Sequence, residues 1–304
     1  MTLPPGHVLR APAPDDLAAV HAVLAAAEIV HAGRPQTMAA EVARDWDLPG
    51  FDLARDAWLV EDGGAVVAAA WLIAEPGAAE VAVHPESCGR GVGTALREAV
   101  EARAVEVITR DALKQHVWGT NDAARELLGA AGYSFAHRYT TMHIDLDGPV
   151  PAAAVPEGIV LREFEPGLDD RAIYDIDNAA FADSPDFQAQ AFGFWQAEHV
   201  EVATLQPGTS PVAWHGNQPV GFAFNHLRDG ALGYVEILAV RADRRRRGIA
   251  RALLLRSFAA LAAAGAQAVE LRVVGSNDAG RRLYESAGMR PDGIVDRYEK
   301  PLPQ

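Results

Sequence analysis

Two hydrophobic periods alternate along this chain and predict an ordered series of strands and helices. Apolar and β-branched residues occur with strand character over residues 57–61, 65–74 and 79–83, and again over 210–215, 218–227 and 231–240. Short turn sequences such as Asp62-Gly63-Gly64 and Gly216-Asn217 separate these stretches. They predict antiparallel hairpins.

Helical spacing of apolar residues fills much of the remaining chain. The predicted helices cover residues 15–27, 37–46 and 89–104, then 168–181, 188–199 and 248–264. Further strands are predicted at 7–11, 115–118 and 134–146, then at 159–163, 269–274 and 294–299. Asn121 and Asn277 each stand where a side chain would cap a short final helix. We expect the strands at 134–146 and 294–299 to close the first and second halves of the chain, respectively.

The second half of the chain repeats the first. VLRAPAP at 8–14 recurs as VLREFEP at 160–166, and GTNDAARELLGAAGY at 119–133 recurs as GSNDAGRRLYESAGM at 275–289. The offsets, 160 − 8 = 152 and 277 − 121 = 156, show that order and spacing are kept with small insertions. The sequence therefore predicts an α+β fold used twice, each copy a mostly antiparallel mixed sheet flanked by helices. The domains are 1–146 and 159–304, joined by a proline-, alanine- and glycine-rich linker at 147–158.

Composition limits the classes of function. The formal net charge is −14, which argues against nucleic-acid binding because such proteins need a positive surface. The single cysteine, Cys88, excludes an intramolecular disulfide framework and a cysteine-rich zinc site. No stretch is long and apolar enough for a signal peptide or a membrane span. We expect a cytoplasmic protein, monomeric or homodimeric, with no nucleic-acid, membrane or metal partner.

A run of arginines lies between the end of a predicted strand and the start of a predicted helix. The strand GYVEILAV ends at Val240, and helical apolar spacing begins at Ile249, directly after Gly248. A helix N-terminus offers free backbone N–H groups and a favourable dipole to an anion, and glycine lets a phosphate come close. Arginine side chains add charge-assisted hydrogen bonds. The run Arg244–Arg247 predicts a phosphate-binding loop, with a solvated charge run as the alternative.

The loop resembles the pyrophosphate loop of the GNAT N-acetyltransferase superfamily, Arg/Gln-x-x-Gly-x-Gly/Ala, as Arg245-Arg246-Arg247-Gly248-Ile249-Ala250. Asn277-Asp278-Ala279-Gly280-Arg281-Arg282-Leu283-Tyr284 is similar to the start of the family's second signature, Asn-x-x-Ala-x-x-x-Tyr. The resemblance covers nearly the whole chain, once per half. It implies acetyl-CoA as cofactor. The residues that it assigns to cofactor binding in the second half are Leu238, Ala239, Val240, Arg245, Arg246, Arg247, Gly248, Ile249, Ala250, Asn277 and Arg281.

Acetyl transfer to an amine needs a base, a carbonyl-polarising donor and an acid. The resemblance implies that the N–H of Leu238 polarises the thioester carbonyl and that Tyr284 protonates the departing thiolate. Strand alternation would place Glu236 on the face of Leu238, so its carboxylate is the candidate general base. Tyr234, two residues earlier, is the competing polar group. The alternatives are an aromatic packing role for Tyr284 and a cross-strand ion pair for Glu236.

The two halves are not equivalent. Cys88 replaces the first loop arginine in the first copy, and Leu128 stands where Tyr284 stands in the second. Leucine cannot protonate a thiolate. The first half is therefore predicted to be non-catalytic. Its retained glycine loop still makes cofactor binding a candidate role for Val83, Arg90, Gly91 and Gly93.

The tandem arrangement is similar to that of the mycothiol synthase family. The segments 180–186 and 221–226 lie where that family has two substrate-side motifs, and this chain departs from both. Asp186, Tyr234 and Arg272 are the candidate acceptor-binding residues. The departures favour an N-acetyltransferase acting on the primary amine of another small molecule. Mycothiol synthase proper, an aminoglycoside-type N-acetyltransferase and a non-catalytic acyl-CoA-binding regulator remain as alternatives.

Overall fold

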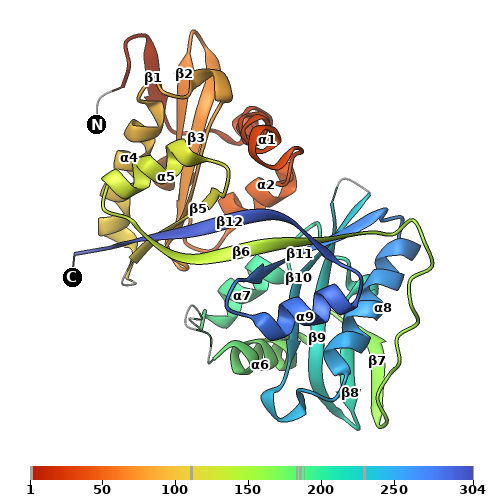
Figure 1. The fold of residues 1–304 in the computed structure, drawn as a ribbon. Coiled ribbons are helices and arrows are strands. Elements are labelled where there is room, and N and C mark those ends of the chain that lie inside the picture. The colour runs from red at the N-terminus through yellow and green to blue at the C-terminus, as the bar shows by residue number, and fades with distance from the viewer. Residues whose placement is uncertain are drawn as a thin grey trace. The chain divides into compact units, whose positions relative to one another are not determined.

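A computed structural model describes residues 3–109, 112–182, 184, 187, 189–228 and 231–303. The chain forms two compact units, and most of their elements are labelled in Figure 1. Unit 1 contains residues 1–139 and 293–304, and unit 2 contains residues 140–292. No helix among the described residues is long and apolar enough to cross a membrane.

Unit 1 is a mostly antiparallel sheet with helices on both faces. Its strands are β1 (His7–Arg10), β2 (Ala57–Asp62), β3 (Ala65–Ile73), β4 (Ala78–Val83), β5 (Ala112–Trp118) and the last strand of the chain, β12 (Arg290–Pro301). They follow one another in this order across the sheet, and β4 with β5 is the parallel pair. Its helices are α1 (Leu17–Ala32), α2 (Ala39–Asp47), α3 (Leu53–Asp56), α4 (Val92–Val107) and α5 (Asp122–Ala130).

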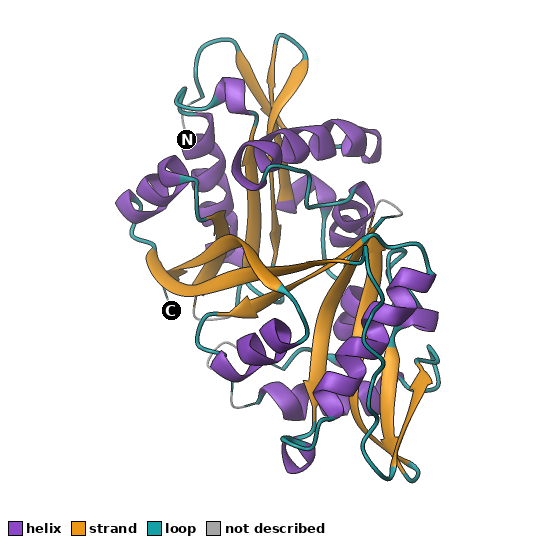
Figure 2. Cartoon of the chain, turned by 45° about the vertical axis from the view of Figure 1, so that its right-hand side comes forward, coloured by secondary structure: helices purple, strands orange, loops and turns teal. Residues whose placement is uncertain are grey.

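Unit 2 repeats this plan. Its strands are β7 (Ile159–Glu163), β8 (Pro211–His215), β9 (Gln218–Arg228), β10 (Leu232–Val240) and β11 (Ala268–Val274), and beside β11 lies β6 (Ser134–Asp145). Its helices are α6 (Asp170–Phe181), α7 (Phe192–His199), α8 (Ile249–Ala263) and α9 (Asp278–Ser286). Again one pair, β10 with β11, is parallel. The predicted fold class and the repeated order of elements are confirmed (Figure 2).

The two terminal strands do not stay with the halves from which they come. β12 pairs antiparallel with β5, from Val295 opposite Trp118 to Pro301 opposite Ala112. The second part of β6 enters unit 2, where the side chain of Met142 is fully buried among unit 2 residues. The units therefore differ from the sequence repeats at these two strands. Alternation of apolar residues predicts a strand but does not identify the sheet that it joins.

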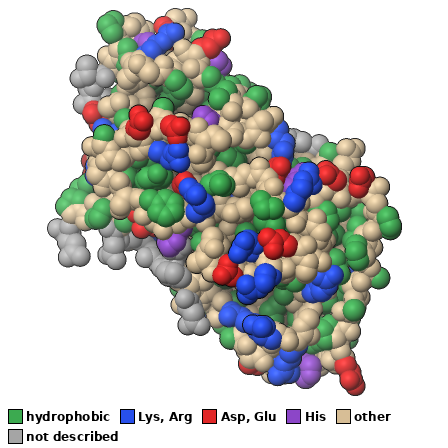
Figure 3. Space-filling model, in the orientation of Figure 1, with side chains coloured by type: hydrophobic (Ala, Val, Ile, Leu, Met, Phe, Trp, Pro, Cys, Tyr) green, Lys and Arg blue, Asp and Glu red, His purple; other side chains and the backbone are tan. Residues whose placement is uncertain are grey.

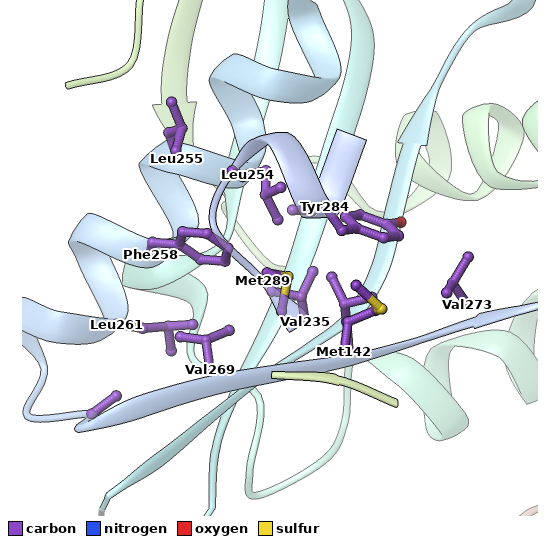
Figure 4. Close-up of a cluster of buried hydrophobic side chains, with 14 residues drawn as sticks. Met142, Val235, Leu254, Leu255, Phe258, Leu261, Val269, Val273, Tyr284 and Met289 are labelled. Atoms are coloured by element: carbon purple, nitrogen blue, oxygen red, sulfur yellow. The ribbon is translucent and has the colours of Figure 1, made fainter. Parts of the chain in front are cut away.

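Separate hydrophobic clusters hold the helices to each face. In unit 2, α8 and α9 pack on one face through a cluster that includes Phe258, Leu261 and Tyr284, drawn in Figure 4. On the opposite face, Ile173 of α6 and Trp195 of α7 pack against β9. Unit 1 has the same two-faced arrangement around β3.

Candidate functional site

Strand β10 leaves part of its backbone free at one edge. Its parallel pairing with β11 ends at Tyr234 opposite Glu270, while its antiparallel pairing with β9 continues to Val240. The N–H of Arg241 donates to the carbonyl of Val220 at 3.0 Å. Because hydrogen-bonded pairs alternate in an antiparallel ladder, Ala239 also bonds to β9, and the N–H groups of Leu238 and Val240 point to the other edge. Beyond Tyr234, that edge has no strand partner among the described residues.

A β-bulge in β10 changes the face of the sheet on which the Glu236 side chain lies. Val235 lies opposite Asn225 and Ile237 lies opposite Phe224, so Glu236 is an extra residue in β10. Ile237 packs in the cluster under α6 and α7, whereas Leu238 packs with α8. Glu236 contacts His199 of α7. The expectation that Glu236 and Leu238 share a face is therefore wrong, because the bulge shifts the alternation by one residue.

The loop after β10 has a left-handed backbone at two positions. Arg246 has φ 64° and Gly248 has φ 83°, both in the left-handed region. Glycine adopts this region without steric cost, whereas an arginine there is strained. Gly248 is the N-cap of the 15-residue helix α8, whose first N–H groups have no partner within the helix. The loop therefore has the backbone geometry of an anion-binding site.

The predicted arginines of this region have different environments. Arg245 donates from Nε to the carbonyl of Val240 at 3.1 Å and from Nη2 to that of Ala180 at 2.6 Å, so it ties the loop to β10 and α6. Arg246 and Arg247 are exposed beside the start of α8. Arg281 is exposed and pairs with Asp278 at 2.8 Å. Figure 3 shows basic side chains gathered over the region of α9.

Three further cofactor-side candidates lie at the starts of α8 and α9. Ile249 is buried against α8 and β8 residues, and Ala250 is half-buried next to it. The Oδ1 of Asn277 accepts from the N–H of Gly280 at 2.8 Å, so this side chain caps α9 as the sequence predicts. Asn121 caps α5 in the same way.

Glu236 lies between two histidines. Its Oε2 atom is 3.1 Å from Nε2 of His226 and 3.3 Å from Nδ1 of His199. Burial opposes ionisation of Glu236, but the two imidazoles outweigh it and hold the pKa of this carboxyl well below its usual value. Glu236 is therefore ionised at neutral pH, as a base or an ammonium-binding group must be.

His199 carries the positive charge of this cluster. Burial lowers its pKa, but Glu236, Glu198 and Asp177 together raise the pKa to about 9. Asp177, which accepts from Nε1 of Trp195 at 2.9 Å, has its pKa raised to about 6, chiefly by burial. At neutral pH His199 is therefore an imidazolium that faces these carboxylates.

Tyr284 lies in the α8–α9 cluster with 8% of its surface exposed. Figure 4 shows its hydroxyl directed away from Phe258 and Leu261. Burial raises the pKa of Tyr284 to about 12, so the phenol is protonated at neutral pH. The hydroxyl makes no hydrogen bond with a described residue. It is therefore available as a proton donor.

The candidate acceptor residues are only partly brought together. Tyr234 lies opposite His226 in the ladder, and the Arg228 guanidinium stacks over its ring at 3.8 Å from the centroid. Arg272 is exposed on β11 and has an interaction partner. Asp186 lies outside the described residues.

The first unit keeps the loop but not the polar cluster. Gly89 and Gly91 have φ 75° and 89°, matching Arg246 and Gly248 in the second unit. Val83 stands at the end of β4, and Gly93 packs against it in the first turn of α4. Arg90 is exposed, 4.0 Å from Asp62. Cys88 is an exposed free thiol, and Leu128 is buried in the core.

One group among the described residues has the geometry of a cation site, although the sequence predicts none. His143, Glu270 and Asp292 each bring one ligand atom within 4.8 Å of the others. Nδ1 of His143 is already 3.0 Å from Oε1 of Glu270. This contact already gives both buried side chains a polar partner, and we assign no metal to the group.

Sequence reasoning missed the partners of Glu236. His199 ends α7 and Thr204 follows it, while His226 lies 27 positions after His199 in β9. No spacing motif connects these residues. The available signal was the position of His226 directly opposite Tyr234, which a hairpin register would have given.

Comparison with known proteins agrees with the repeat seen in the sequence. The Acetyltransferase (GNAT) family profile matches twice, at residues 25–133 and 171–289. A mycothiol acetyltransferase from Thermobispora bispora is 32% identical over 243 residues, covering 76% of this chain and 78% of that protein. Another from Geodermatophilus obscurus is 31% identical over 293 residues, covering 90% of this chain and 91% of its own length.

A solved structure shows the same fold over nearly the whole chain. The GCN5-related N-acetyltransferase from Sphaerobacter thermophilus has a TM-score of 0.79 and 30% sequence identity, covering 99% of this chain and 97% of that one. Similarity to acyltransferases therefore extends across both units rather than one.

Proposed function

Because the chain belongs to the acetyltransferase (GNAT) family, which uses acetyl-CoA, we propose that its second unit transfers an acetyl group to a primary amine of a small molecule. One observation carries the proposal. In unit 2, an ionised glutamate at a β-bulge lies beside a strand edge with free N–H groups, and a left-handed loop leads from that edge into a helix N-terminus.

The residues present fit acetyl-CoA. The left-handed loop at Arg246–Gly248 and the first N–H groups of α8 suit a diphosphate. The free N–H groups of Leu238 and Val240 suit the amide-bearing pantetheine arm, with that of Leu238 nearest to the bulge. Arg246, Arg247 and Arg281 are exposed cations near the loop or on α9. When bound, acetyl-CoA supplies the activated acetyl thioester.

The chain's own groups then account for the proton movements of direct attack in a ternary complex. Glu236 binds the ammonium and receives the proton that frees the nitrogen lone pair. The N–H of Leu238 donates to the carbonyl oxygen as negative charge develops on it. Tyr284 donates its phenolic proton to the leaving sulfur and regains one from the nitrogen as the amide forms. Overall, the ammonium and the thioester give an amide, a thiol and one proton. That proton passes from Glu236 to water.

Unit 1 is proposed as a non-catalytic unit that retains cofactor-binding geometry. Val83, Arg90, Gly91 and Gly93 correspond to the cofactor side of the second site. Position 128 is a leucine rather than a tyrosine, and β4 has no extra residue that would correspond to Glu236.

Substituting Tyr284 by phenylalanine tests the reaction. Tyr284→Phe removes only the hydroxyl and is expected to lower kcat at least about tenfold, a lower bound set below the roughly 100- to 10,000-fold that a general acid typically contributes. The measurement is thiol release from acetyl-CoA with a panel of primary amines. Tyr133→Phe is the matched control, because Tyr133 is also buried but lies in unit 1. An unchanged rate in Tyr284→Phe would exclude the acid role, and acetyl-CoA binding without transfer to any amine would favour a regulatory protein.

The acceptor of the mycothiol acetyltransferase relatives is a second candidate. The identity of 31% over 90% of the chain favours it. The departures of segments 180–186 and 221–226 from that family's two substrate-side motifs favour a different amine. Comparing kcat/KM for the cysteinyl amine of the mycothiol precursor with that for aminoglycosides and simple amines separates these candidates.

A further inference from the structure

Both histidines that flank Glu236 contact the same carboxylate oxygen. Nε2 of His226 and Nδ1 of His199 lie 3.1 Å and 3.3 Å from Oε2. Oε1 of Glu236 accepts no hydrogen bond from a described residue, and the side chain is 21% exposed. The carboxylate is therefore held through Oε2, and Oε1 can accept a hydrogen bond from a further donor.

Each imidazole is itself fixed by a second group. His226 has 4% of its side chain exposed, and its Nδ1 lies 2.9 Å from Oγ1 of Thr204. With the Thr204 hydroxyl donating to Nδ1, Nε2 carries the hydrogen and donates to Glu236. The orientation of His226 is therefore set from the side opposite Glu236.

His199 is held between two carboxylates. Its Nε2 is 3.4 Å from Oε2 of Glu198, which accepts from Nε2 of Gln190 at 2.6 Å. The Trp195 ring packs against the imidazole, with centroids 5.8 Å apart. The Nδ1 contact with Glu236 is an ion pair rather than an aligned hydrogen bond. The charge of His199 is thus its main contribution.

We propose that His199 and His226 are positioning residues that hold Oε2 of Glu236 and present Oε1 to the ammonium group of the acceptor. This inference rests on the proposed amine acetylation. It makes the site selective for a cationic nitrogen, because a hydroxyl acceptor brings no positive charge to Oε1. The bulge is necessary for this arrangement, since it turns Glu236 toward α7 and His226.

The first test needs no turnover and follows histidine titration by NMR in labelled protein. The His199 resonance is identified by its loss in His199→Asn. We expect its midpoint to fall by at least about one pH unit in Glu236→Gln, because the ion pair is lost. An unchanged midpoint would show that the two groups are not paired in solution and would overturn the inference, whatever the catalytic result.

The second test measures amine and acetyl-CoA KM values separately, with the best primary amine of the panel. His226→Leu removes the donor to Oε2 and is expected to raise the amine KM about tenfold, the scale of one hydrogen bond to a charged group. His226→Gln can still donate to Oε2 and is expected to return the amine KM to within about threefold of the starting protein. His199→Asn is expected to raise the amine KM about threefold. The KM for acetyl-CoA should stay within twofold in all three.

His215→Gln is the control, since His215 is exposed on β8 and no role in the site is proposed for it. Equal losses in His226→Leu and His226→Gln, or an unchanged amine KM in His226→Leu or His199→Asn, would contradict positioning. Failure of the starting protein to acetylate any amine would instead count against the proposed function, while the NMR result would still decide whether Glu236 is paired with His199.

Discussion

The two units share a backbone but differ at the strand that would carry the chemistry. In unit 1, β4 pairs with β3 in unbroken register from Ala78 to Val83. In unit 2, β10 contains one additional residue between Tyr234 and Val240, and that residue is Glu236. The duplicated scaffold therefore differs by an insertion at the point where the acetyl group is proposed to lie.

The proposed phosphate-binding loop, in contrast, has the same backbone geometry in both units. The left-handed residues Gly89 and Gly91 in unit 1 correspond to Arg246 and Gly248 in unit 2. In both units the strand before the loop ends its parallel pairing early, which leaves backbone N–H groups free. Backbone geometry for an anion can thus be kept while the side chains for proton transfer are absent, since the first depends on φ and ψ and the second on particular residues.

The greatest effect is expected from removing β12, which belongs to the second sequence repeat but completes the sheet of unit 1. A fragment of residues 1–158 lacks β12, which pairs with β5 and buries Val295 in unit 1. We expect this fragment to lose cooperative unfolding in circular dichroism melts, because β5 then exposes a strand edge. The same fragment with residues 289–304 fused at its end should recover a cooperative transition. A cooperative melt of the unfused fragment would show that β12 is dispensable.

Placing a β-branched residue at each loop glycine separates the roles of the units. Gly248→Val forces valine to φ near 83° and places its side chain where a diphosphate would approach. Losing two hydrogen bonds to phosphate costs about 3 kcal/mol, so kcat/KM for acetyl-CoA should fall about 100-fold. Gly91→Val has the same strain in unit 1 and should leave turnover within twofold. Similar losses in both variants, at matched thermal stability, would mean that both loops serve catalysis.

The buried polar cluster of unit 2, which has no counterpart among the described residues of unit 1, should make the free energy of unfolding depend on pH. The groups facing His199 are Glu236 of β10, Glu198 of α7 and Asp177 of α6, and they raise its pKa from 6.5 to about 9. Because the folded-state pKa exceeds the unfolded one, this stabilisation is complete below pH about 6.5 and is lost as pH rises through about 9. The change in the pKa of His199 corresponds to a stabilisation of roughly 3 kcal/mol.

Urea denaturation at pH 7 and at pH 9.5 measures this effect. The starting protein should lose more free energy of unfolding between these pH values than His199→Asn, because the asparagine side chain at position 199 does not titrate. Equal losses in the two proteins would assign the pH dependence to other groups. Tyr284, with its pKa raised to about 12, contributes only above this range.

Much of the fold could be read from periodicity because the two copies reinforce each other. The helix predicted at 248–264 is observed at Ile249–Ala263, and the strand predicted at 231–240 is observed at Leu232–Val240. The Asn121 and Asn277 caps were also predictable, since capping depends on residues three positions apart. Local patterns thus gave the elements and their order.

The duplication, the glycine loop and the leucine in place of a phenol at position 128 all follow from the amino-acid sequence alone, because each is a property of neighbouring residues or of aligned repeats. The place of β12 in unit 1 and the bulge that turns Glu236 toward His199 and His226 are visible only in the folded chain. Strand partners and bulges are fixed by contacts between residues distant in sequence, and a strand pattern with period two is the same whichever sheet it joins.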